Sequence, residues 1–366
     1  MRTVTGGRMV LPVGQKGIAV KEKTSQAKLS AFERFRELLA RAGFDSFLLA
    51  LVGVIGLAAW RPHYGTGEAP LPLAQIANYG VSVIFFFYGL RLSPAKLREG
   101  LGNWRLHLVV QLATFLVFPL LVLAGYRLFA RDSTQLLWLG TFYLAALPST
   151  VSSSVVMVSI AGGNLPGAIF NASISSLIGV FLTPLWMGLF LTAQAGSYDL
   201  WPVIGKLTLQ VVVPVVLGIG LHGKGGAFAE RNRKPLRLFD QAIILLIVYT
   251  SFCESFARRL FAGYRTLDLV GLGAAMLGLF LGVYGLVHVA SRLLRFNRAD
   301  RITALFCGSK KSLVQGTVMS RVLFPDPNVV GIVLLPIMLY HALQLLAASI
   351  IAQSMARRHG VRNAGE

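Results

Sequence analysis

Long apolar stretches separated by short polar and basic segments run along most of the chain. A helix needs roughly 17 to 25 apolar residues to cross the hydrocarbon core of a bilayer. We predict ten membrane helices, at about Phe44–Trp60, Leu73–Leu92, Leu106–Phe129, Leu136–Ala161, Leu165–Ala193, Trp201–His222, Leu238–Phe256, Leu267–Leu294, Ile302–Leu323 and Val329–Met355. The pattern therefore predicts an all-α polytopic membrane protein.

Composition supports this prediction and explains the charge. Of the 366 residues, 55% are hydrophobic and only 14% are charged, which is more apolar than an ordinary soluble domain. The net charge of +20 would suggest nucleic acid in a soluble protein, but the basic residues lie in short clusters between apolar stretches. We expect a lipid bilayer and no nucleic acid as a partner. Cys253 and Cys307 lie inside apolar stretches, without a disulfide or zinc-ligand pattern.

The distribution of Lys and Arg predicts the orientation. With residues 1–43, 91–105, 224–237, 292–301 and 356–366 inside, the cytoplasmic segments hold 25 Lys and Arg and the opposite loops, with Arg321 among them, hold 7. By the positive-inside rule both termini are cytoplasmic, in the plasma (inner) membrane. We divide the chain into a cytoplasmic basic N-terminal tail at 1–43, five-helix repeats at 44–193 and 194–355, and a cytoplasmic C-terminal tail at 356–366.

Ten helices with both termini on one side form two halves of five helices that enter the membrane in opposite orientations, which is an inverted repeat. Helix four is interrupted by Pro148–Ser154, and helix nine by Cys307–Ser312. Such breaks must face protein or a water-filled cavity, and broken helices form ion and solute sites. The alternative for helix four is a serine-rich packing face that only bends the helix.

The two breaks supply the candidate binding residues. In the first break these are Ser149, Thr150, Ser152, Ser153 and Ser154, in the second Ser309, Lys310, Lys311, Ser312 and Gln315, and supporting polar residues are Gln111, Thr114, Asn171, Ser173 and His341. One lysine at the bilayer centre costs about 2.5 to 3.5 kcal/mol. On a helix Lys310 and Lys311 point about 100° apart, so we expect one to face the helix-four break and the other to snorkel or pair with carbonyls. The alternative is that helix nine begins later.

The sequence predicts no enzyme. Asp240 and Glu254 are the only carboxylates near helix interiors, and both lie close to predicted helix ends. Paired catalytic carboxylates are absent, and so are the P-loop, HExxH, GxSxG and EF-hand patterns. We therefore expect neither catalysis nor a cofactor.

Three stretches carry a family resemblance. They are YGLRLSPAKLREGLGNWRLHLVVQ (Tyr88–Gln111), LPSTVSSSVVMVSIAGGN (Leu147–Asn164) and ALFCGSKKSLVQGTVM (Ala304–Met319). Over about Phe44–Met355 the chain resembles the bile acid:sodium symporter superfamily, within its SBF-like (sodium/bile acid cotransporter 7-like) subgroup. The resemblance implies inverted repeats, a panel domain of helices one, two, six and seven, and a core domain whose helices four and nine cross at their breaks. It also implies a secondary transporter of organic anions that binds sodium behind the crossing.

The chain departs from the family's sodium ligands. Ser154 matches the family serine, but Val155 stands in place of the asparagine that follows it. In helix nine, Phe306 replaces the family glutamate and Lys310 and Lys311 replace a Gln-Asn pair. The acidic sodium ligand is therefore missing. Our hypothesis is that one lysine ammonium takes the place of sodium, as a fixed cation or as a proton carrier.

Two functions remain open from the sequence. The first is a secondary active transporter of a small organic anion, coupled to sodium, to protons or to neither. The family glutamine of helix three corresponds either to Gln111 or to Thr114, so this ligand does not decide the coupling. The alternative is a non-transporting membrane regulator of another membrane or ion-homeostasis system, built on the same fold.

Overall fold

The computed structural model describes residues 46–66, 71–91, 102–131, 134–195, 205, 208–259, 262, 264–324 and 326–363. These ranges contain helices and no strand. The elements are α3 (Ser46–Trp60), η2 (Pro62–Tyr64), α4 (Leu73–Arg91), α6 (Trp104–Leu112), η4 (Ala113–Val117), α7 (Phe118–Phe129), α8 (Gln135–Ala146), α9 (Ser152–Ala161), α10 (Leu165–Ala195), η6 (Thr208–Val212), α12 (Val213–Gly220), α13 (His222–Arg231), α14 (Arg233–Ala257), α15 (Thr266–Leu293), α16 (Arg298–Gly308), α17 (Leu313–Leu323) and α18 (Pro327–Asn363).

Each of the ten predicted stretches contains helix, and six helical spans are long and apolar enough to cross a membrane. The six are Leu73–Arg91, Trp104–Phe129, Leu165–Leu191, Arg233–Ala257, Thr266–Leu293 and Val329–Arg357. Thr208–Gly220 and His222–Arg231, which are bent by 97° at their junction, add a seventh if they form one span. A polytopic all-helical membrane protein is thus confirmed, whereas the count of ten helices stays a prediction.

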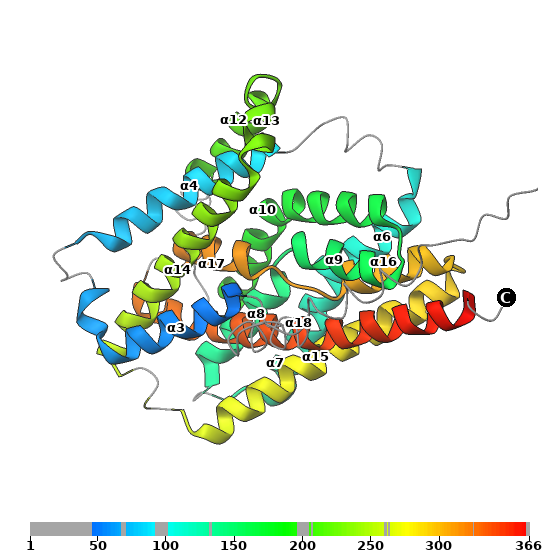
Figure 1. Cartoon of the computed structure of the whole chain (residues 1–366). Helices are drawn as coiled ribbons and strands as arrows, with labels where there is room; N and C mark the ends of the chain where they lie inside the picture. The colour runs from blue at the N-terminus through cyan, green and yellow to red at the C-terminus, as the bar shows by residue number, and fades with distance from the viewer. Residues whose placement is uncertain are drawn as a thin grey trace, which may run out of the picture. The chain divides into compact units, whose positions relative to one another are not determined.

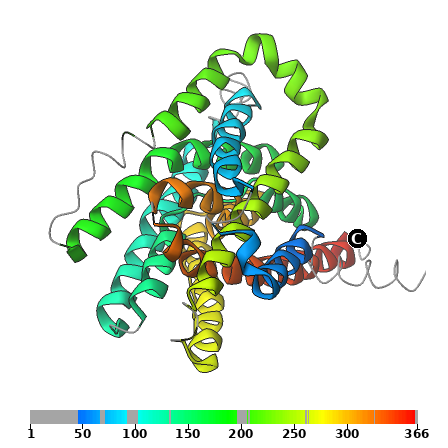
Figure 2. The same ribbon diagram turned by 90° about the vertical axis from the view of Figure 1, so that its left-hand side faces the viewer.

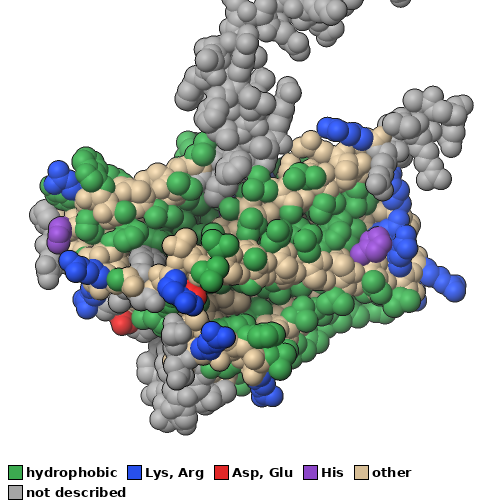
Figure 3. All heavy atoms as spheres, turned by 90° about the horizontal axis from the view of Figure 1, so that it is seen from below, with side chains coloured by type: hydrophobic (Ala, Val, Ile, Leu, Met, Phe, Trp, Pro, Cys, Tyr) green, Lys and Arg blue, Asp and Glu red, His purple; other side chains and the backbone are tan. Residues whose placement is uncertain are grey.

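The surface agrees with a lipid environment. Apolar side chains cover most of the face in Figure 3, and Lys and Arg gather mainly toward its ends. On α15, Leu267, Val270 and Leu293 are 70%, 63% and 77% exposed. Soluble monomers rarely expose apolar patches of this extent, so this surface is suited to acyl chains and the chain is an integral membrane protein.

One group of helices packs through glycine. The helix α14 contacts α3 and α4, and α4 contacts α12. At the contact of α4 with α12, a Cβ on Gly218 would lie 2.2 Å from the Phe86 carbonyl oxygen, and a Cβ on Gly89 would lie 2.2 Å from the Val215 oxygen. The two backbones approach this closely because neither position carries a side chain.

The remaining helices surround the two breaks. The helices α8, α9, α10, α16 and α17 contact one another or α18, and α15 runs beside α18 (Figure 1). Buried aromatic rings fill the space between them. Phe118 lies edge-on to Tyr340, with 6.1 Å between ring centroids, and Phe280 lies 6.3 Å from the same ring. The breaks therefore lie in a packed interior rather than against lipid.

The basic segment at 224–237, which was predicted to lie between two membrane helices, is itself mostly helical. The helix α13 connects α12 to α14 at an angle to both (Figure 2), and α14 begins at Arg233. Ala229 and Leu236 pack with Leu90 in a small apolar cluster. This apolar side of a basic segment explains the helix, since an amphipathic helix can cover the end of α4 and leave its charges outside.

Three other expectations differ from the structure or lie outside it. Arg321 belongs to the last turn of α17 rather than to a loop, and its guanidinium donates to the Ile247 carbonyl and the Thr250 hydroxyl of α14. The helix α18 continues to Asn363, beyond the predicted end of its segment. The tail at 1–43 lies outside the described residues.

The glycine contact predicts a stability effect. Gly218→Ala should lower the free energy of unfolding by about 1–3 kcal/mol, because the added methyl group overlaps backbone atoms of α4 that cannot move aside cheaply. Thermal unfolding of the purified protein in detergent measures the change. Gly220→Ala in the same helix is the matched control, since a Cβ there meets nothing within 4 Å. Equal destabilisation by both variants would contradict the proposed close contact.

Candidate functional site

The two helix breaks meet in the interior. The helix α8 ends at Ala146 and α9 begins at Ser152, while α16 ends at Gly308 and α17 begins at Leu313. The Ser312 N–H donates to the Pro148 carbonyl at 2.9 Å, which joins one break to the other. Figure 1 shows the extended stretch between α16 and α17 passing beside α9. Both predicted interruptions are therefore present, and they lie against each other.

Serine hydroxyls of the first break donate hydrogen bonds to backbone carbonyls at the start of the second break. Ser149 Oγ donates to the Cys307 carbonyl at 2.6 Å, and Ser154 Oγ donates to the Phe306 carbonyl at 3.1 Å. These carbonyls belong to the last turn of α16, which has no intrahelical donors for them. The Ser149 N–H in turn donates to Ser175 Oγ at 3.0 Å. The buried serines thus bind protein groups of the crossing.

Lys311 is the most constrained charged group at the crossing. Its Nζ donates to the carbonyl oxygens of Thr114, Ala145 and Leu147, each at 2.7 Å. It also lies 4.2 Å from the centroid of the Phe118 ring, and the side chain is 1% exposed. We call the three carbonyls the carbonyl cage. All three ammonium donors are used, so the cage binds the lysine as it would bind a small cation.

Local helix chemistry leaves the cage carbonyls free. Ala145 and Leu147 lie at the C-terminal end of α8, where carbonyls lack intrahelical donors and a cation is favoured. In the π-helical turn η4 the Phe118 N–H donates to the Ala113 carbonyl. The corresponding donor for Thr114 would come from Pro119, which has no N–H. The π-turn and the proline together therefore present the Thr114 carbonyl to Lys311.

Lys310 is equally buried but less constrained. Its Nζ donates to the Ser153 carbonyl at 3.0 Å, and its side chain is 0% exposed. An ammonium has three donors, and only this one has an acceptor among the described residues. The expectation is confirmed in its carbonyl form, since Lys310 faces the Ser153 carbonyl of the first break and Lys311 pairs with three carbonyls. The 100° separation of a helix does not apply, because both residues lie between α16 and α17.

The helix α18 holds the second break in place. Gln344 accepts from the Lys311 N–H at 2.9 Å and donates to the Lys311 carbonyl at 2.8 Å. Its Nε2 lies 3.1 Å from His341 Nδ1, which connects the predicted His341 to the second break through Gln344. Tyr340 donates to the Ser309 carbonyl at 2.7 Å. Gln344 was visible as a polar residue in an apolar helix, but nothing in the sequence separates Tyr340 from other core aromatics.

The other residues of the breaks have local roles. The Ser312 hydroxyl accepts from the Gln315 N–H at 3.3 Å and so caps α17. Gln315 is buried, and its Oε1 has no hydrogen-bond partner among the described residues. Ser153 Oγ donates to the Thr150 hydroxyl at 3.4 Å. Ser152 begins α9, and its side chain lies outside the description.

Several supporting residues lie away from the lysines. Gln111 donates to the carbonyl and the side-chain oxygen of Asn171, each at 3.3 Å, which joins α6 to α10. Ser173 contributes its carbonyl, which accepts from Tyr88 of α4 at 3.2 Å. Thr114 contacts Lys311 through its backbone carbonyl. Gln111, Asn171 and Ser173 therefore form contacts between helices.

Carboxylates are missing from the crossing within the described part of the chain. No described Asp or Glu forms an ion pair with Lys310 or Lys311. Phe306, at the position of the family glutamate, is buried, with its ring 6.2 Å from that of Tyr284. The described residues also contain no group of three His, Cys, Asp or Glu able to hold a metal ion. The local charge is that of the two lysines.

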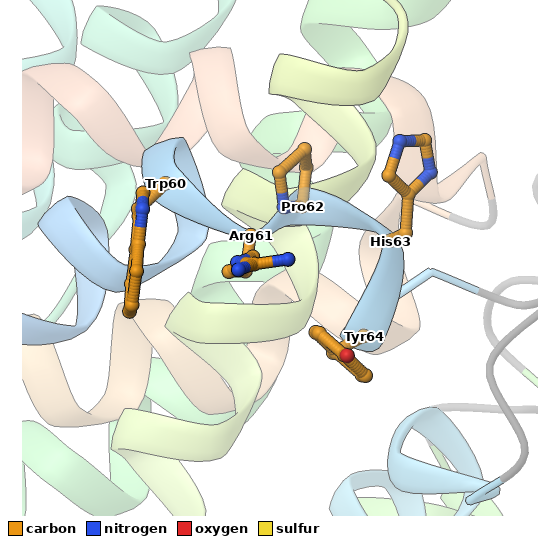
Figure 4. Close-up of a pocket in the computed structure, with 5 residues that line it drawn as sticks. All are labelled: Trp60, Arg61, Pro62, His63 and Tyr64. Carbon is orange, nitrogen blue, oxygen red and sulfur yellow. The ribbon is translucent and has the colours of Figure 1, made fainter.

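A hollow at the end of α3 is a separate feature. It is lined by Trp60, Arg61, Pro62, His63 and Tyr64, none of which belongs to a break (Figure 4). The Arg61 guanidinium lies 5.0 Å from the centroid of the Trp60 ring, and Trp60 and Tyr64 are 72% and 60% exposed. Exposed Trp, Tyr and Arg at a helix end are typical of the membrane–water interface. We interpret Trp60, Arg61 and Tyr64 as side chains that anchor this end of α3 at the membrane–water interface.

Comparison with known proteins gives a consistent set of relatives. The model of the SBF-like CPA transporter family matches residues 45–357. An uncharacterized protein of Pseudomonas aeruginosa is 42% identical over 86% of this chain and 93% of its own length. The Escherichia coli protein YfeH, named provisionally as a symporter, is 37% identical over 86% of this chain and 93% of its own length. Mouse sodium/bile acid cotransporter 7 is 29% identical over 89% of this chain and 98% of its own length.

The unequal contacts of the two lysines predict unequal stability effects. Lys311→Met should lower the free energy of unfolding by about 3 kcal/mol, because it leaves three buried carbonyls without a donor, and Lys310→Met by about 1 kcal/mol. Both variants remove one buried charge, which stabilises the fold by a similar amount in each. This contribution therefore cancels when the free energies of unfolding of the two variants are compared. Thermal unfolding in detergent measures both. A Lys310→Met variant as unstable as Lys311→Met would contradict the difference between the two environments.

Proposed function

The chain belongs to the SBF-like CPA transporter family, and we propose that it is a secondary active transporter of a small organic anion. The observation that carries the proposal is the crossing of two broken helices with two buried lysines at their breaks. Buried ionisable groups in membrane proteins are costly and mark solute or ion pathways. The names of the relatives support transport but not a particular solute.

We propose ten membrane helices in two inverted repeats, at 44–193 and 194–355, with both termini cytoplasmic in the plasma (inner) membrane. The matched breaks in α8–α9 and α16–α17 support the repeat. The contacts among α3, α4, α12 and α14 support a panel domain, against which the helices around the crossing move as a core domain. The excess of basic residues in the segments assigned inside supports the orientation.

Positive charge at the crossing favours an anionic solute. No described carboxylate neutralises Lys310 or Lys311. Within the described part of the chain, Lys310 has a single acceptor, the Ser153 carbonyl in the first turn of α9. The N-terminal turn of α9 adds backbone N–H donors and a positive dipole end. A carboxylate or sulfonate of the solute would give Lys310 acceptors beyond the one that the described residues supply.

The carbonyl cage argues against sodium coupling. Lys311 uses three carbonyl oxygens at 2.7 Å, which are the kind of ligand that a sodium ion would need. An ammonium that donates to all three leaves no oxygen of the cage for a metal ion. We propose that Lys311 is a fixed internal cation, and that Lys310 is the lysine that contacts the solute.

Uptake into proteoliposomes tests the proposal. A panel of labelled organic anions, carboxylates and sulfonates, is offered with and without sodium and pH gradients. We expect uptake by the wild type that does not require sodium, and a loss of about tenfold or more in Lys310→Met, because a charge-assisted contact of at least about 1.4 kcal/mol is removed. Lys224→Met, at an exposed lysine of α13, is the matched control and should transport normally.

The outcomes of the uptake assay separate the alternatives. Sodium-driven uptake by the wild type would overturn the assignment of Lys311 as the internal cation. Uptake that is unchanged in Lys310→Met would overturn the solute contact. A folded wild type that carries no anion of the panel would contradict transport and favour the regulatory function.

Sodium binding gives a test that needs no solute. We expect the melting temperature of the wild type to be the same in sodium chloride and choline chloride, because the cage is filled. Lys311→Ala empties the cage, so sodium should bind there and raise the melting temperature of this variant by mass action. Lys310→Ala is the matched control and should show no sodium effect. A sodium-dependent rise in the wild type would contradict a filled cage.

A further inference from the structure

Asp300, near the start of α16, is a buried carboxylate that no lysine or arginine neutralises within the described residues. The side chain is 8% exposed. Its Oδ2 accepts from Asn103 Nδ2 at 2.9 Å and from Asn297 Nδ2 at 2.7 Å, and its Oδ1 accepts from Asn164 Nδ2 at 2.7 Å. Burying a carboxylate costs free energy. Because the described partners of this one are three neutral amides, its position calls for a structural explanation.

Each of the three asparagines also caps a helix. The side-chain oxygens of Asn103, Asn164 and Asn297 accept from the backbone N–H of the third residue of α6, α10 and α16, at 3.4, 2.9 and 2.8 Å. An asparagine amide has one oxygen and one NH₂ group. Each residue therefore uses its oxygen on its own helix and its nitrogen on Asp300.

Asp300 thus lies where three helix N-termini converge. Each N-terminus carries a partial positive charge, which favours a negative group there. We propose that Asp300 is an anionic hub that holds the N-termini of α6, α10 and α16 together and so positions the lysines of the crossing. It is a positioning residue, which acts through Lys311, and the inference does not depend on what the protein transports.

The hub is directly connected to the carbonyl cage. The helix α16 is 11 residues long, begins at the hub and ends just before the break that carries Lys311. The helix α6 also begins at the hub and leads into η4, whose Thr114 carbonyl belongs to the cage. Lys311 and one of its acceptors therefore follow directly after two short helices, and the starts of these two helices are joined at Asp300.

Asn164 adds further contacts to the same end of α16. Its N–H donates to the Ala299 carbonyl at 3.2 Å, and its carbonyl accepts from Thr303 Oγ1 at 3.0 Å. A Cβ on Gly163 would lie 2.8 Å from a side-chain carbon of Ile302. The corner between α9 and α10 thus fits closely against α16, which makes the Asp300–Asn164 contact a fixed one rather than a surface ion contact.

The chemistry of the hub predicts what single and double changes do. In Asp300→Asn one oxygen becomes a donor that faces the donor of Asn164. If the Asn164 amide flips so that its oxygen accepts from the new amide at position 300, its nitrogen then faces the Gly167 N–H that it capped before. One hydrogen bond is therefore lost in either orientation. The exchange Asn164→Asp with Asp300→Asn restores the pattern, because the new carboxylate caps α10 and accepts from the new amide.

Cysteine reactivity is the readout. Cys307 is buried near the end of α16, and Cys253 is buried in α14, which takes no part in the hub. In the full chain with Cys253→Ser, Asp300→Asn should raise the rate of Cys307 labelling by N-ethylmaleimide about tenfold, the equivalent of one lost charge-assisted hydrogen bond. The exchanged pair should bring the rate back to within about threefold of wild type.

The control distinguishes positioning from general loosening. With Cys307→Ser, the labelling rate of Cys253 should stay unchanged by Asp300→Asn. An equal rise at Cys253, an unchanged rate at Cys307, or an exchanged pair that is no better than Asp300→Asn would each overturn the hub. If Asp300→Asn does not fold, Asn103→Ala removes one of the three donors to Asp300 together with the cap of α6 and should raise Cys307 labelling, and no rise would overturn the proposal.

Discussion

A helix break inside a membrane persists only if its freed backbone groups find partners in the protein. This constraint governs the crossing described here. The end of α16 is satisfied by serine hydroxyls, the end of α8 by the Lys311 ammonium, and Ser312 joins the two breaks through Pro148. The surrounding aromatic packing and the contact of Gln344 with Lys311 follow from the need to keep these partners in place.

A lysine ammonium, rather than a metal ion, binds the free carbonyls at the end of α8, and this changes the electrostatics of the site. A metal ion in the carbonyl cage could dissociate, but a lysine stays attached to the chain. In the proposed transporter its positive charge therefore stays near the crossing whatever ions are present, which would favour an anionic solute over exchange of a cation. Lys310, with one carbonyl acceptor, adds a second charge next to the first. Two adjacent buried charges of one sign repel each other, so a bound anion lowers the energy of both.

The half-helix α16 is held at both ends by different chemistry. At its start an anion, Asp300, gathers three positive helix ends, and after its end a cation, Lys311, meets the negative end of α8. Each charge lies where the helix dipoles favour its sign. A helix of 11 residues is marginal by itself, so these two contacts fix its position in the interior more than its intrinsic propensity does.

Local chemistry made the helical class, the two breaks and the basic segments predictable, because apolar length, proline and runs of small hydroxyl residues act within one turn or one span. The sequence alone also singled out Lys310 and Lys311, since charge is unexpected in an apolar stretch. Only the tertiary structure decided their partners, because the carbonyls of Thr114 and Ala145 lie 197 and 166 residues away from Lys311, and a backbone carbonyl has no sequence signature. For the same reason the Asp300 hub was not predicted. Its three asparagines look like separate helix caps until the fold brings them to one carboxylate.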